Sequence, residues 1–170
     1  MKKADKILTL AFLLVMGIAG NSFAQVSANA SVSVNLITPI TITKTVDMNF
    51  GNVAVSASPG TVVLAPAGTR TLTGGITLPV VTGTVTAASF TVTGSTTYTF
   101  SISLPSSPLT ITSGANTMTV SAFTSNPSTT GTLAAGTATL SVGATLNVGA
   151  SQPAGAYTSA TPFSVTVNYN

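Results

Sequence analysis

The sequence predicts an all-β protein made of antiparallel strands, folded as a β-sandwich or a β-barrel. No helical periodicity is visible after residue 24, where Thr, Ser, Val, Ala and Gly dominate. Short runs alternate apolar and polar residues, which is typical of strands with one buried face, because successive side chains point to opposite sides. Gly, Pro, Asn and Ser separate these runs at short intervals and predict turns between the strands.

Residues 1–24 have the pattern of a secretory signal peptide. Three lysines precede an apolar run over Ile7–Ile18, and Ser22–Ala24 offers small residues where a signal peptidase cleaves. We therefore expect an exported protein that crosses the periplasm and reaches the cell surface or the medium. A second cut after Ala30 and an uncleaved membrane anchor are the alternatives, although the apolar run is short for a spanning helix.

The segment Gln25–Leu36 is predicted to be a leading strand. At roughly 3.3 Å per residue its twelve residues would extend about 40 Å, longer than an ordinary edge strand. It contains no charge and no proline, the devices that normally protect an edge from pairing. Pairing with its own domain, as the first strand of a self-contained sandwich, is the alternative. One face of the segment carries Val26, Ala28, Ala30, Val32, Val34 and Leu36.

The remaining strands are predicted from alternation and from β-branched residues, which suit a pleated surface. Alternation is clearest in Thr97–Leu104, and the turn Ser113–Asn116 predicts a hairpin. A bulge is expected at Gly143. In chain order the predicted strands are Ile40–Val46, Thr61–Ala65, Arg70–Leu78, Ala87–Thr93, Thr97–Leu104, Leu109–Ile111, Met118–Val120, Ala138–Val148 and Phe163–Tyr169.

Residues 37–170 are predicted to form one sandwich domain, since no charged linker divides them and their length suffices for one core. A transmembrane barrel is the competing all-β architecture. Such a barrel needs aromatic girdles at both membrane interfaces, and the chain has no Trp and few Tyr.

The residue inventory argues against an enzyme. After residue 24 the charged side chains are Lys44, Asp47 and Arg70, and there is no His, Glu or Cys. General acid–base pairs, thiol nucleophiles and metal ligand sets cannot be assembled from these residues, so we expect no catalytic residues, no cofactor and no metal. No basic patch is available for nucleic acid, and no disulfide can form.

Two sets of motifs resemble known families. The segments Gly68–Thr71, Thr73–Gly75 and Phe123–Pro127, together with the closing strand, resemble a secreted bacterial domain of unknown function, DUF4402. Met48–Val53 and Gln152–Tyr157 are similar to motifs of archaic chaperone–usher pilins and of spore coat protein U domains.

The pilin resemblance implies an immunoglobulin-like antiparallel β-sandwich with an N-terminal donor-type strand. Residues 25–36 would then enter the groove of another copy, in a head-to-tail homopolymer assembled with a periplasmic chaperone and an outer-membrane usher. Unlike archaic pilins, which commonly carry a cysteine pair, this chain has none. The acceptor groove would be bordered by Phe163, Val165, Val167 and Tyr169.

We therefore expect a structural subunit of a bacterial surface fibre, pilus-like or fimbria-like, with a role in adhesion or biofilm. Its partner would be itself, with no nucleic acid and, after signal cleavage, no membrane. The alternative is a self-complemented monomer, a secreted or cell-surface β-sandwich that binds an unknown ligand.

Overall fold

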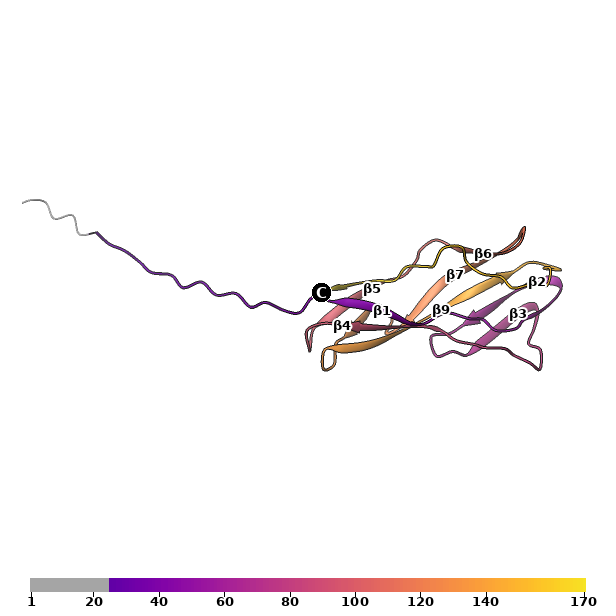
Figure 1. The fold of residues 1–170 in the computed structure, drawn as a ribbon, viewed down its shortest axis with the longest axis horizontal. Coiled ribbons are helices and arrows are strands. Elements are labelled where there is room, and N and C mark those ends of the chain that lie inside the picture. The colour runs from indigo at the N-terminus through magenta and orange to yellow at the C-terminus, as the bar shows by residue number, and fades with distance from the viewer. Residues whose placement is uncertain (1–24) are drawn as a thin grey trace, which may run out of the picture. The chain divides into compact units, whose positions relative to one another are not determined.

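Antiparallel strands make up all the regular secondary structure that the computed structural model describes, which covers residues 25–170 (Figure 1). The predicted signal peptide, residues 1–24, lies outside the described residues. The chain divides into two units, one ending at Asn35 and one spanning Leu36–Asn170. The strands of the second unit are β1 (Thr41–Val46), β2 (Ala54–Leu64), β3 (Arg70–Thr77), β4 (Ala88–Thr93), β5 (Thr99–Ser103), β6 (Leu109–Ser113), β7 (Asn116–Asn126), β8 (Thr130–Thr132), β9 (Thr137–Val148) and β10 (Thr166–Tyr169).

Two sheets form, in agreement with the predicted all-β class and consistent with a β-sandwich. The larger has seven strands and runs β1-β4-β9-β2-β3, with β7 also paired to β9 and β6 paired to β7. The smaller has three strands in the order β10-β5-β8. The predicted hairpin is confirmed, because Ser113 pairs with Asn116 and Leu109 with Val120.

Strand β9 organises the larger sheet. Along one edge it pairs first with β4, through Thr137–Val142, and then with β2, through Ala144–Val148. Its other edge pairs with β7. The partner changes at Gly143, where an added Cβ would overlap the carbonyl of Leu64. The expected bulge lies across the ladder instead, in β7, where the register shifts between Ser121 and Thr124.

The registers also define two ends of the domain. One end, here called the C-terminal pole, holds the start of β1, the end of β4, the start of β9 and the C-terminus (Figure 1). The opposite end, here called the far pole, holds the end of β9, the β6–β7 turn and the end of β3, because these strands run past the level of Val148.

The core consists of two hydrophobic clusters. The first lies between the two sheets, and its largest fully buried side chain is Phe100. Its buried members are Ala88, Phe90, Val92, Phe100, Leu133, Leu140, Val142 and Val167. The second lies on the larger sheet toward the far pole and contains Val62, Ile76, Val120, Ala144, Leu146 and Val148. No residue of the three-stranded sheet belongs to this second cluster, so a different part of the chain has to cover it.

The leading strand expected over Gln25–Leu36 is absent from the structure. Residues 25–40 carry no regular secondary structure, and no described strand pairs with them. The side chain of Val32 is 96% exposed and that of Leu36 is 88% exposed. A strand is held by ladder hydrogen bonds to a neighbour; without such a neighbour, the alternating pattern alone does not produce one.

Candidate functional site

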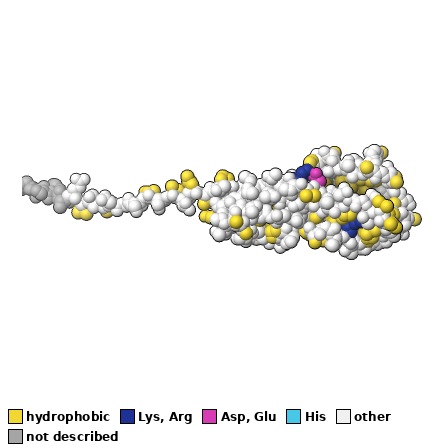
Figure 2. Space-filling view, turned by 60° about the horizontal axis from the view of Figure 1, so that its bottom comes forward, with side chains coloured by type: hydrophobic (Ala, Val, Ile, Leu, Met, Phe, Trp, Pro, Cys, Tyr) yellow, Lys and Arg dark blue, Asp and Glu magenta, His cyan; other side chains and the backbone are white. Residues whose placement is uncertain are grey.

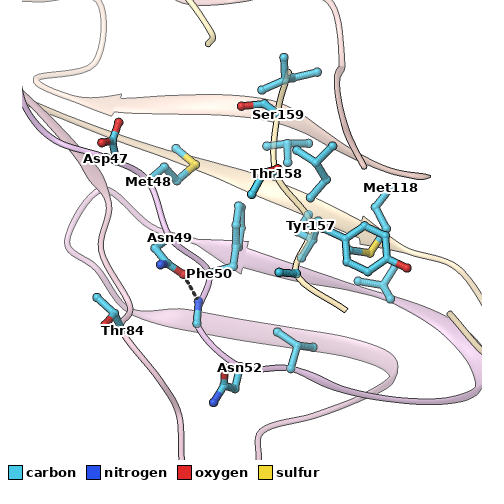
Figure 3. A pocket seen from close by; sticks show the side chains of 18 of the residues that line it. Asp47, Met48, Asn49, Phe50, Asn52, Thr84, Met118, Tyr157, Thr158 and Ser159 are labelled. Carbon is cyan, nitrogen blue, oxygen red and sulfur yellow. Dashed lines mark hydrogen bonds between the residues drawn. The ribbon is translucent and has the colours of Figure 1, made fainter. Parts of the chain in front are cut away.

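A groove of about 960 Å³ opens over the second cluster. Two irregular segments form its walls: residues 47–53, which follow β1, and residues 152–163, which precede β10. In Figure 3, Met48 and Phe50 project from the first wall toward the segment that carries Tyr157 and Thr158. Both walls of the groove therefore consist of chain that lies outside the strands of the two sheets.

The floor of the groove is apolar because it is the part of the core that the three-stranded sheet does not cover. β6, β7 and β9 contribute aliphatic side chains and Met118, and β4 adds Ala88 and Phe90. Phe163 closes one end, with its ring edge-on to Phe90 at a centroid distance of 6.3 Å and tilted against Phe123 at 5.1 Å. Members of the second cluster on the floor are Val120, Leu146 and Val148, joined by Leu109, Ile111 and Met118.

The first wall is held on its outer side by residues 82–86. Asn49 and Thr86 exchange two backbone hydrogen bonds of 2.8 and 3.0 Å, and the Asn52 N–H donates to the carbonyl of Thr82 at 2.7 Å. Gly51 turns the chain with φ +69°, a conformation that favours glycine. Its N–H donates to Oδ1 of Asn49 at 2.8 Å (Figure 3).

Arg70 supports this wall from the start of β3. Its guanidinium donates to the carbonyl of Phe50 at 2.5 Å and to that of Asn52 at 3.1 Å. One charged side chain thus satisfies two carbonyl groups that have no strand partner. In the sequence, Arg70 stands out as one of three charged side chains after residue 24, as the start of a predicted strand and as part of a family motif, and none of these predicts its contact with residues 50 and 52. The signal for its role is that it is the one arginine in the sequence.

We expect Arg70→Met to loosen the first wall. The substitution keeps an apolar stem but removes both hydrogen bonds, so the free energy of unfolding should fall by about 1–2 kcal/mol. The exchange rate of the Asn52 amide should also rise. Lys44→Met is the matched control, because the ion pair of Lys44 with Asp47 is short (2.6 Å) but its side chains are 55% and 80% exposed. Such a pair contributes little; equal losses in the two variants would contradict the role of Arg70.

The second wall is almost free of backbone pairing. Within residues 152–163, Thr158 is the one residue with backbone–backbone hydrogen bonds, exchanged with Thr112 of β6 at 2.8 and 3.0 Å. Side chains brace the start of the wall, where Gln152 donates to the hydroxyl of Tyr157, which donates to the carbonyl of Pro153. Unpaired N–H and C=O groups beside an apolar surface are in general able to pair with an added β-strand.

The four residues expected to border the groove lie in different parts of the structure. Phe163 lines the groove. Val167 is buried in the first cluster, and Val165 and Tyr169 pack against that cluster without lining the groove. Met48, Phe50, Met118 and Tyr157 line the groove without having been predicted to do so, although three of them lie in the segments Met48–Val53 and Gln152–Tyr157. The six apolar residues expected to be donated are all exposed.

Outside the groove, the described residues contain few charged or metal-binding side chains. Residues 25–170 contain no group of three or more His, Cys, Asp or Glu side chains that could hold a metal. Charged side chains are few on the face shown in Figure 2. Within the same residues, no helix is long and apolar enough to cross a membrane.

Comparison with known proteins identifies the domain. No curated protein and no solved structure matches this chain. A family model described as "Domain of unknown function (DUF4402)" matches residues 40–169, from the residue before β1 to the end of β10. The match spans the two sheets and both walls of the groove. The chain therefore belongs to the DUF4402 family.

Proposed function

We propose that this protein is a structural subunit of a bacterial surface fibre, assembled head to tail by donor-strand exchange. Residues 25–36 of one copy fill the groove of the next. The observation that supports this best is the groove itself, which combines an apolar floor that the smaller sheet does not cover with a wall whose backbone is nearly unpaired. The same chain carries an unpaired segment with alternating apolar side chains, and Val26 in it is 92% exposed.

The leading segment and the groove are chemically complementary. An inserted strand presents every second side chain to the floor and its backbone to the walls. Each buried Val or Leu contributes roughly 1.5–3 kcal/mol, and each ladder hydrogen bond adds about 0.5–1.5 kcal/mol. Ordering the segment costs about 1–2 kcal/mol per residue for the backbone, so the apolar contacts and the ladder are needed together.

Insertion also completes the architecture. A strand between residues 47–53 and 152–163 extends the smaller sheet over the second cluster, which yields an immunoglobulin-like sandwich of the kind found in pilins. Residues 152–165 run from the far pole toward the middle of the domain, since Gln152 comes four residues after Val148, the end of β9. A strand that enters at the far pole with its N-terminus leading lies antiparallel to them, as in the rest of the fold.

The attachment point of the leading segment and the open part of the groove lie toward opposite ends of the domain, and this arrangement favours an open polymer. The chain joins the body at Thr38, on the C-terminal pole, whereas the groove extends toward the far pole. Head-to-tail contacts between different surfaces do not close unless a rotation makes a ring, so they produce filaments. An exposed apolar groove also needs protection before assembly, which is the role we assign to a periplasmic chaperone, with an outer-membrane usher for export.

Deleting residues 25–36 tests the proposal. The shortened protein should fold as a monomer and form no filaments, because its groove remains while its donor is missing. A synthetic peptide of residues 25–37 should bind it and raise its melting temperature, with about 2.7 kcal/mol of stabilisation when the peptide is in roughly hundredfold excess over Kd.

A control peptide exchanges the apolar residues with their polar neighbours, so that its composition is kept and its alternation is inverted. This peptide should leave the melting temperature unchanged. Filaments that persist after the deletion would contradict the proposal. A full-length protein that stays monomeric at every concentration, with residues 25–36 protected from hydrogen exchange, would instead identify the self-complemented binding domain.

A further inference from the structure

A small apolar loop stands exposed at the far pole. It follows β3 and contains Leu78, Val80 and Val81. Val80 is fully exposed, Val81 is 73% exposed and Leu78 is 41% exposed. Adjacent exposed valines on a small domain indicate a contact with another molecule more often than isolated ones do.

The loop is attached to the wall of the groove. Nδ2 of Asn52 donates to the carbonyl of Val81 at 3.1 Å, and the Asn52 N–H donates to that of Thr82 at 2.7 Å. Asn52 itself lines the groove. Any strand that enters the groove at this end therefore passes beside the loop.

The far pole is the open end of the groove. At the other end Phe163 and Phe90 lie in contact, and beyond them β1 and β10 pack together over the first cluster. An inserted segment that remains connected to its own domain has to leave the groove at the far pole.

At the C-terminal pole, the point where the leading segment joins the domain is held firmly. The N–H of Thr38 donates to Oγ of Ser95 at 2.9 Å, and the hydroxyl of Tyr169 donates to the carbonyl of Thr38 at 2.7 Å. The same hydroxyl accepts from the N–H of Ser95 at 2.7 Å. Tyr98 packs on Tyr169 with ring centroids 5.5 Å apart and is itself 39% exposed.

The connection between the donated segment and this anchored point is very short. The apolar alternation ends at Leu36, and Thr38 is already fixed to the domain, so two residue steps span at most about 7 Å. If the proposed strand exchange occurs, the C-terminal pole of the donor copy has to lie against the far pole of the acceptor copy.

We propose that the loop Leu78–Val81 is a second contact surface of the fibre, and that it packs against Ile37 and Tyr98 of the copy whose leading segment fills the adjacent groove. Ile37 is 40% exposed. This inference rests on the proposed function. The contact restricts the angle between neighbouring copies, because a single-residue connection beside an apolar contact leaves little freedom to bend.

Engineered cysteines test the contact, since the chain has none of its own. A full chain with Val80→Cys and Tyr98→Cys should form disulfide-linked ladders when its filaments are oxidised, visible on denaturing gels without reductant and lost with reductant. A disulfide forms only when the two Cα atoms come within about 7 Å. Val63→Cys with Tyr98→Cys is the control, because Val63 is 39% exposed but lies in β2, away from the far pole.

The outcomes separate the two proposals. Ladders from the Val80 pair and none from the Val63 pair support the contact. Filaments that form normally but give no more cross-linking from the Val80 pair than from the control overturn the contact and leave strand exchange standing. A wild-type chain that forms no filaments overturns strand exchange, and the contact with it. As a second readout, Val80→Ser with Val81→Ser should give filaments that bend more sharply in electron micrographs, whereas unchanged curvature counts against the contact.

Discussion

A chain with Val32→Asp is expected to fold normally and to lose polymerisation. Val32 is 96% exposed in the subunit, so the substitution does not disturb the core. In the fibre the same side chain would face the groove floor, where the loss of burial removes roughly 1.5–3 kcal/mol. An unpaired buried carboxylate costs several kcal/mol more. Assembly should weaken by at least about 1,000-fold, because 1.4 kcal/mol corresponds to a factor of ten.

Light scattering and electron microscopy of the purified chain measure this effect. Ser33→Asp is the matched control, since it adds the same charge one residue later, on the face that would point away from the floor. The Val32→Asp chain keeps an intact groove, so small amounts added to the wild type should shorten the filaments by ending them. Equal polymerisation of the two variants would contradict the predicted alternation of buried and exposed positions.

The second large effect, a loss of folding stability, is expected from a substitution in the core. Phe100 is the largest fully buried side chain and lies in the first cluster, between the two sheets. Its ring packs onto Gly131 of β8 so closely that a Cβ at that position would overlap it. Phe100→Ala should lower the free energy of unfolding by about 3–5 kcal/mol, through lost burial and the cavity left behind. This is a large share of the 5–15 kcal/mol that is typical of a folded domain.

Urea denaturation followed by circular dichroism measures this loss. Thr99→Ala, at the exposed neighbouring position in β5, should change the unfolding free energy by less than about 0.5 kcal/mol. An unchanged denaturation midpoint for Phe100→Ala would show that the three-stranded sheet does not depend on this ring.

Alternation predicted the strands best where one face is buried against a second layer. The expected Ala87–Thr93 became β4, with Ala88, Phe90 and Val92 buried at every second position. Alternation predicted strands less well where few side chains of the strand are buried. The first part of β2, from Ala54 to Gly60, is largely exposed and lies outside the predicted strand, which begins at Thr61. β8 is a three-residue strand of Thr-Gly-Thr, whose pairing depends on β5 and leaves no pattern in the sequence.

The sequence predicted only some of the residues that line the groove. The segments Met48–Val53 and Gln152–Tyr157 are noted in the sequence only for a resemblance to another family, and in the structure both line the walls of the groove. Their side chains do not alternate as in a strand, so no periodicity indicated that they face each other. The pilin resemblance implies a groove border formed by Phe163, Val165, Val167 and Tyr169; in the structure Val167 is buried in the first cluster, and of the four Phe163 lines the groove.

The all-β class, the positions of most strands, the scarcity of charged side chains and the alternation of the leading segment can all be read from the amino-acid sequence, because each depends on local composition or on a period of two residues. The pairing of the strands, the change of partner along β9 and the part of the core that the smaller sheet does not cover are set by the packed domain. These features depend on contacts between residues far apart in the chain, such as Asn49 with Thr86 or Arg70 with Phe50. A local pattern can predict that a segment needs a partner strand, but the place of that partner depends on contacts between distant residues, which a local pattern does not contain.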